Sequence, residues 1–145
     1  MVFRRVLPFL VSLAVISSAQ ATSPTAINAF LTDRFWGNGG TARVICAHER
    51  LGVRDRAVFL WVVCGQYVQR GGSAELIAGE SGPKRLTLDA SGRPLRVEGP
   101  RDGSLYSSDL RRLFPLVVRW RFSPMLTRRV MDRAQREAIR SFSSQ

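Results

Sequence analysis

The sequence has few of the residues on which most enzyme chemistry depends. It contains one histidine, His48, and two cysteines, Cys46 and Cys64. A catalytic triad would have only one imidazole to draw on, and neither a G-x-S-x-G nor a C-x2-C motif occurs. We therefore assign no catalytic residue and no cofactor. A binding or structural protein is favoured over a small hydrolase or metal-dependent enzyme.

Long apolar runs are also absent beyond the first 21 residues, so we expect no membrane span in the mature chain. The run from Val6 to about Ile16 is itself short, because a helix needs about 20 apolar residues to cross a bilayer. It also contains Pro8. Since no cysteine follows this run directly, a bacterial-type lipid anchor is not expected either.

The same run lies between two arginines and the small residues Ala19 and Ala21. A basic head, an apolar stretch and a small-x-small exit are typical of a cleavable secretory signal peptide. We predict a signal peptide at 1–21, cleavage between Ala21 and Thr22, and a single domain over 22–145 that is secreted or periplasmic. The alternative is an uncleaved N-terminal anchor.

Lysine is almost missing, because 21 of the 22 basic residues are arginine. A GC-rich genome gives the same preference, so arginine over lysine is not by itself a sign of phosphate recognition. The net charge is +11 for the whole chain. It is concentrated at the end, since residues 111–145 carry nine arginines against Asp132 and Glu137.

Hydrophobic periodicity predicts an α+β fold: an N-terminal helix, an antiparallel meander of about four to five strands, a short helix and a C-terminal helix. We expect the helices to gather on one side of the sheet. The segment 57–68 is apolar on both faces, which indicates a central strand. The expected helices are 24–36, a short one capped by Ser107 or Ser108, and 124–142; the expected strands are 41–50, 57–68, 74–79, 84–89 and 93–98.

Three segments decide how these elements connect. Glu80–Pro83 and Ala90–Arg93 have the composition of turns, so they are expected to separate strands. The segment 116–122 is ambiguous between strand and helix. Its alternation favours a strand, with Trp120 and Phe122 in the core.

The two cysteines are predicted to form a disulfide. If 41–50 and 57–68 form a hairpin with its turn near Asp55, Cys46 and Cys64 lie roughly opposite each other. Cysteines of an exported protein usually oxidise. Two free thiols, or a metal site of Cys46, His48 and Cys64, are the alternatives. The cysteine spacing does not support the metal site.

Two carboxylates, Asp102 and Asp109, could in principle form an acid–base pair. Asp102 precedes Gly103, a pairing typical of a tight turn. Asp109 lies where a helix would begin, and a carboxylate there is favoured by the helix dipole. Both therefore have structural interpretations, and we assign them no chemistry.

Segment 110–122 mixes arginine with large apolar residues. Such segments bind anionic lipid, nucleic acid or acidic polymers, although solvated arginines over a packed core give the same pattern. A cationic surface over residues 111–140 is our second hypothesis, with an anionic envelope component or a protein as partner and no nucleic acid expected. Its candidate contacts are Arg119, Arg121, Arg128 and Arg129.

Several motifs in residues 57–115 resemble a family of small bacterial exported proteins of unassigned function. They are Phe59-Leu-Trp61 with Tyr67, Glu80-Ser-Gly-Pro83, and Asp102-Gly-x-x-Tyr106-x-x-Asp109 ending in Phe114-Pro115. The order of helix and meander is also similar to cystatin-like or NTF2-like folds. The resemblance implies no catalytic residues, and we expect these motifs to hold the fold, with Tyr106 over the sheet end and Phe114 in the core.

Overall fold

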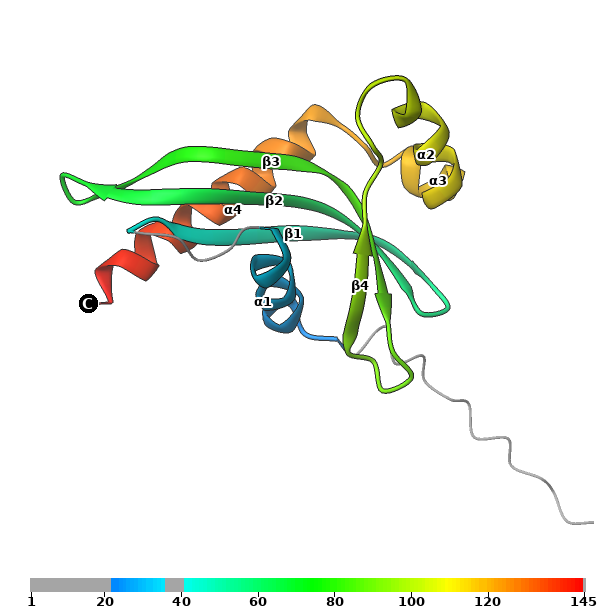
Figure 1. Cartoon of the computed structure of the whole chain (residues 1–145), viewed down its shortest axis with the longest axis horizontal. Coiled ribbons are helices and arrows are strands. Elements are labelled where there is room, and N and C mark those ends of the chain that lie inside the picture. The colour runs from blue at the N-terminus through cyan, green and yellow to red at the C-terminus, as the bar shows by residue number, and fades with distance from the viewer. Residues whose placement is uncertain (1–21, 36–40, 145) are drawn as a thin grey trace, which may run out of the picture.

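The computed structural model describes residues 22–35 and 41–144, and its centre is one antiparallel sheet (Figure 1). An N-terminal helix, a four-strand meander, short helices and a C-terminal helix follow one another, which confirms the predicted α+β class. The predicted signal peptide and the segment 37–40 lie outside the described residues. The elements are α1 (Pro24–Phe35), β1 (Arg43–Arg54), β2 (Ala57–Arg70), β3 (Ser73–Leu88), β4 (Pro94–Glu98), the 3-10 turn η2 (Gly103–Leu105), α2 (Tyr106–Leu113), α3 (Leu116–Arg119) and α4 (Pro124–Ser143).

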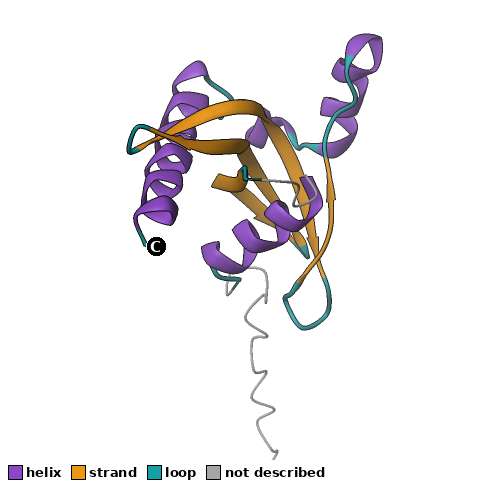
Figure 2. Ribbon diagram, turned by 60° about the vertical axis from the view of Figure 1, so that its left-hand side comes forward, coloured by secondary structure: helices purple, strands orange, loops and turns teal. Residues whose placement is uncertain are grey.

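Helices cover both faces of the sheet rather than one (Figure 2). On one face, Ile27 and Leu31 of α1 pack against alternate residues of β2. On the other, Leu126 and Val130 of α4 pack against the intervening residues of the same strand. The expectation that the helices gather on one side was therefore wrong. Strand β2 is buried on both faces, as its composition predicts.

Strand β3 is one continuous element where the sequence suggested two. Residues Glu80–Pro83 pair with Trp61–Cys64 of β2 and do not form a turn. Strand β4 pairs only with the far end of β3, from Arg85 onward. Pro83 therefore lies where β3 is an edge of the sheet, and proline is tolerated at edges because no second neighbour needs its missing N–H. Ala90–Arg93, by contrast, does form the expected turn.

The segment 116–122 is helical at its start, so the favoured strand was wrong. Helix α3 ends at Arg119, and only Val118 of its four residues is buried. Phe122 is half-buried against Trp61, with ring centroids 5.4 Å apart. Trp120 is 76% exposed, which contradicts its expected place in the core.

The predicted helix starts are confirmed in part. The Ser23 hydroxyl accepts a hydrogen bond from the Ala26 N–H at 3.1 Å and so caps α1. Neither Ser107 nor Ser108 caps α2, because both lie inside that helix. Met131 of α4 is exposed. Along the described part of the chain, no helix has the length and hydropathy needed to cross a membrane.

Candidate functional site

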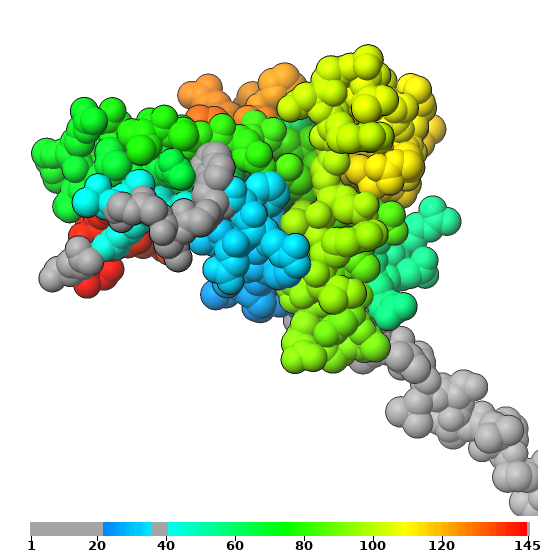
Figure 3. Space-filling model, viewed as in Figure 1, coloured from blue at the N-terminus to red at the C-terminus, as the bar shows by residue number. Residues whose placement is uncertain are grey.

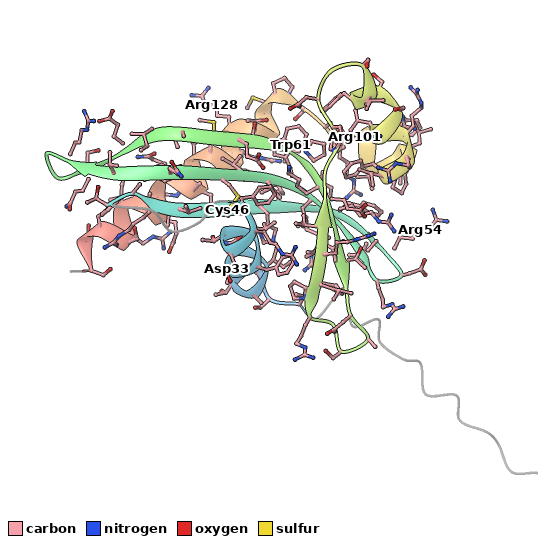
Figure 4. The ribbon with its side chains drawn as sticks, viewed as in Figure 1. Asp33, Cys46, Arg54, Trp61, Arg101 and Arg128 are labelled. Carbon is pink, nitrogen blue, oxygen red and sulfur yellow. A yellow bond between two sulfur atoms is a disulfide. The ribbon has the colours of Figure 1, made fainter. Side chains whose placement is uncertain are left out.

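The disulfide joins Cys46 of β1 to Cys64 of β2, on the face that α1 covers. The two residues are direct partners in the register, with Cα atoms 4.1 Å apart, as the hairpin alignment predicted (Figure 4). Because both sulfur atoms are used in this bond, the alternative metal site with His48 does not form. The cysteine pair is therefore a structural cross-link of the hairpin.

His48 lies on the same face and is buried against α1. Its Nδ1 donates a hydrogen bond to the Asn28 side-chain oxygen at 2.7 Å. Burial lowers the pKa of His48 to about 4, and the nearby charges of Arg50 and Arg133 add to this shift. The imidazole is thus neutral at neutral pH, and its Nδ1 is engaged in the hydrogen bond to Asn28. Both properties fit a packing role better than a catalytic one.

The two carboxylates named from the sequence do not form an acid–base pair. Asp109 is buried and held by Arg101, whose Nε and Nη2 donate to its two oxygens at 2.8 and 3.0 Å. Arg112 adds a third side-chain contact at 3.3 Å. The Arg101 hydrogen bonds hold the pKa of Asp109 well below its usual range. Asp102 remains exposed at the start of η2.

Two of the three motifs on which the resemblance rests lie beside each other. Glu80–Lys84 of β3 and Pro100–Asp102 line one cavity of about 290 Å³, together with Tyr106. Arg101 extends from this loop to α2, where it holds Asp109 (Figure 4). The structural role that we expected of these motifs is therefore visible: they connect β3, the loop and α2. Phe114 is buried in the core at the end of α2, as predicted.

The four arginines predicted as anionic-surface contacts are not equivalent. Arg121 donates to the Leu51 carbonyl at 2.6 Å, and Arg129 forms an ion pair with Glu49 at 2.8 Å. Arg119 is half-buried, and its Nε has no hydrogen-bond partner among the described residues. Arg128 extends away from the start of α4 (Figure 4). Only part of the predicted set is therefore available to a ligand.

The largest exposed apolar side chains near these arginines form what we call the α3 patch: Leu116, Val117, Trp120 and Met125. All four are more than half exposed. Leu116 and Val117 lie on α3, Trp120 directly follows it, and Met125 lies in the first turn of α4, whereas Val118 of α3 is buried. Several exposed apolar residues at one place are unusual for a surface without a partner.

A separate cluster of arginines lines a cavity of about 540 Å³, which we call the arginine pocket. Sequence reasoning named none of its members as a candidate contact, although Arg111 and Arg112 lie within the cationic segment 111–140. The turn between β1 and β2 contributes two of them, β3 one and the last turn of α2 two; these are Arg54, Arg56, Arg85, Arg111 and Arg112. The cluster depends on the strand register, which brings together members from three distant segments of the chain.

Comparisons with known proteins give no further guide to the site. No protein-family model matches the chain, and neither the curated proteins nor the solved structures contain a match. The functional argument therefore rests on the residues themselves.

Proposed function

We propose that this protein is exported through residues 1–21 and works in the cell envelope as a non-enzymatic domain that binds an anionic membrane surface. The observation that carries the proposal is the exposure of Trp120, directly after the short helix α3, which also exposes Leu116 and Val117. Tryptophan is favoured at membrane interfaces because its ring is apolar and its N–H is polar.

Charge around the α3 patch favours an anionic surface over a neutral one. Arg111 and Arg112 precede the patch, and Arg128 follows it in the chain. An arginine near an anionic bilayer contributes about 1 kcal/mol, and a fully buried large apolar side chain contributes about 1.5–3 kcal/mol. Reversible peripheral attachment needs only a few such contributions, so partial insertion of the patch is sufficient.

Export supports the same proposal. The Cys46–Cys64 disulfide suits an oxidising compartment, where nucleic acid is not the expected partner. Thr22, which follows the predicted cleavage site, is already part of the fold: its hydroxyl donates to the Gly92 carbonyl at 2.7 Å. Thr22 therefore belongs to the folded domain, and the resemblance to small exported proteins agrees with this proposal.

Vesicle sedimentation of the chain from Thr22 tests the proposal. We expect the protein to sediment with vesicles containing phosphatidylglycerol, to bind phosphatidylcholine vesicles weakly, and to lose binding between about 50 and about 500 mM NaCl. The double variant Leu116→Ser/Trp120→Ser should bind at least about tenfold more weakly. Leu95→Ser is the matched control, because Leu95 is an exposed apolar residue on β4.

Two results would overturn the proposal. One is equal sedimentation of the wild type and the Leu116→Ser/Trp120→Ser variant. The other is a wild-type oligomer, seen by light scattering, that the same variant converts to a monomer, since the patch would then be an interface between copies of the chain.

A further inference from the structure

We infer that the arginine pocket is a second binding site, for a ligand bearing a phosphate group with at least two negative charges. The pocket is built on the sheet face opposite to α1, at the end that α4 leaves uncovered, since no residue of α4 lines it. It lies at the end of the molecule where Figure 3 shows α2 and α3 above the tip of the β1–β2 hairpin.

Strand register explains why arginines from distant segments converge. Arg85 of β3 pairs with Phe59 of β2, so both side chains lie on the same face. Phe59 in turn contacts Phe114, at 5.9 Å between ring centroids. Phe114 ends α2 and thereby places the last turn of that helix, with Arg111 and Arg112, over the same end of the sheet.

The hairpin turn completes the pocket from the other side. Arg54 is the last residue of β1, and Arg56 immediately precedes β2 (Figure 4 labels Arg54). Asp55 lies between them and is the single acidic residue among those that line the pocket. Five arginines and one aspartate therefore line the pocket. A concave surface lined mainly by one sign of charge concentrates counter-ions.

The protein supplies fewer carboxylates than guanidinium groups at this pocket. Asp55 lines it, and Asp109, which Arg112 contacts at 3.3 Å, also binds Arg101. The Arg85 Nε is buried and has no hydrogen-bond partner among the described residues. A buried donor without a partner costs free energy, and an oxyanion ligand would supply the missing acceptor.

Guanidinium chemistry and the size of the pocket point to the ligand class. The planar N–H fork of arginine matches two oxygens of a phosphate, so several arginines favour a multiply charged phosphate over a lone carboxylate. A volume of about 540 Å³ exceeds what one bare phosphate ion needs. A pyrophosphate, or a phosphate carried by a larger molecule, fits better.

A lipid headgroup and a soluble phosphate compound both supply this chemistry. A smaller apolar cavity of about 260 Å³ adjoins the pocket and shares Arg54, Phe59 and Pro115 with it. Val117 of the α3 patch also lines this smaller cavity. The arginine pocket is therefore close to the proposed membrane-binding patch, but its ligand chemistry does not depend on that patch.

Calorimetric titration with pyrophosphate tests whether the pocket binds a soluble phosphate compound. Sedimentation with phosphatidate vesicles tests whether it binds a lipid headgroup. Each is measured for the chain from Thr22 and for three charge-matched variants, Arg85→Gln, Arg111→Gln and Arg136→Gln. Arg136 is exposed on α4, away from the pocket, and is the control. Because Arg111 is exposed, Arg111→Gln keeps the test valid if Arg85→Gln fails to fold.

We expect Arg85→Gln and Arg111→Gln each to weaken binding of at least one probe about tenfold, while Arg136→Gln stays close to wild type. An effect on pyrophosphate identifies a soluble ligand. An effect of Arg85→Gln on phosphatidate vesicles alone identifies a headgroup, because Arg111 also flanks the α3 patch and Arg85 does not. Equal loss in all three variants, or wild-type binding of neither probe, overturns the inference. Trp120→Ser separates it from the proposed function, because that variant should keep pyrophosphate binding.

Discussion

The two faces of the sheet are stabilised in different ways. The face under α1 contains a disulfide and a neutral buried histidine, both of which depend on solution chemistry. The face under α4 contains a chain of aromatic contacts from Phe59 through Phe114 and Phe122 to Trp61. The free energy of unfolding should therefore be lowered by reductant and acid through the first face. It should be lowered by the removal of side-chain volume through the second face.

Truncation of Phe114 should have the largest effect. Phe114 is buried where α2 meets the sheet, and Phe→Ala substitutions in cores cost about 3–5 kcal/mol. We expect Phe114→Ala to lower the free energy of unfolding by that amount in urea titrations. Leu116→Ala, two residues away and exposed, should change it little. A small effect of Phe114→Ala would show that the α4 face does not depend on the aromatic chain.

Removal of the disulfide should come next. Cys46 and Cys64 are 18 residues apart, and closing a loop of this length stabilises a fold by about 3 kcal/mol in the chain-entropy model. The double variant Cys46→Ala/Cys64→Ala should lose about this amount. Reductant should destabilise the wild type similarly and leave the double variant unchanged. A wild type that is indifferent to reductant while its thiols are titratable would contradict the prediction.

Acid should produce the smallest of the three effects, through His48. Its pKa is lowered to about 4 in the folded protein, so the unfolded chain, with a pKa near 6.5, binds more protons between these values. Stability therefore falls as the pH drops through this window, by about 2 kcal/mol between pH 7 and pH 5. His48 is the only histidine, so His48→Gln should remove most of this slope. If the free energy of unfolding of that variant falls with pH as steeply as that of the wild type, other titratable groups cause the dependence.

The sequence predicted what depends on local pattern. The strand alignment placed Cys46 opposite Cys64, and hydrophobic periodicity placed a helix at 24–36, where α1 lies. The continuity of β3 was missed because Glu80–Pro83 has the composition of a turn, and only an open sheet edge allows it in a strand. Helix α3 was missed because four residues are too few to show a helical period.

The arginine pocket could not be predicted from composition. Arg54, Arg85 and Arg111 come from the end of β1, from β3 and from the end of α2, and composition does not show that these segments meet. The buried ion pair of Asp109 with Arg101 was also missed. An acidic residue early in a helix is usually solvated, so the sequence did not indicate burial. Both depend on tertiary placement.

The position of the disulfide has a consequence for the order of assembly. It joins neighbouring strands, so oxidation requires only the hairpin of β1 and β2. Helix α4 is the last element of the chain and closes the other face. In a chain that emerges from its N-terminus, the α1 face can be packed and covalently fixed before the residues of α4 are present. Until they arrive, the aromatic face stays uncovered, and during that interval the chain is most exposed to aggregation.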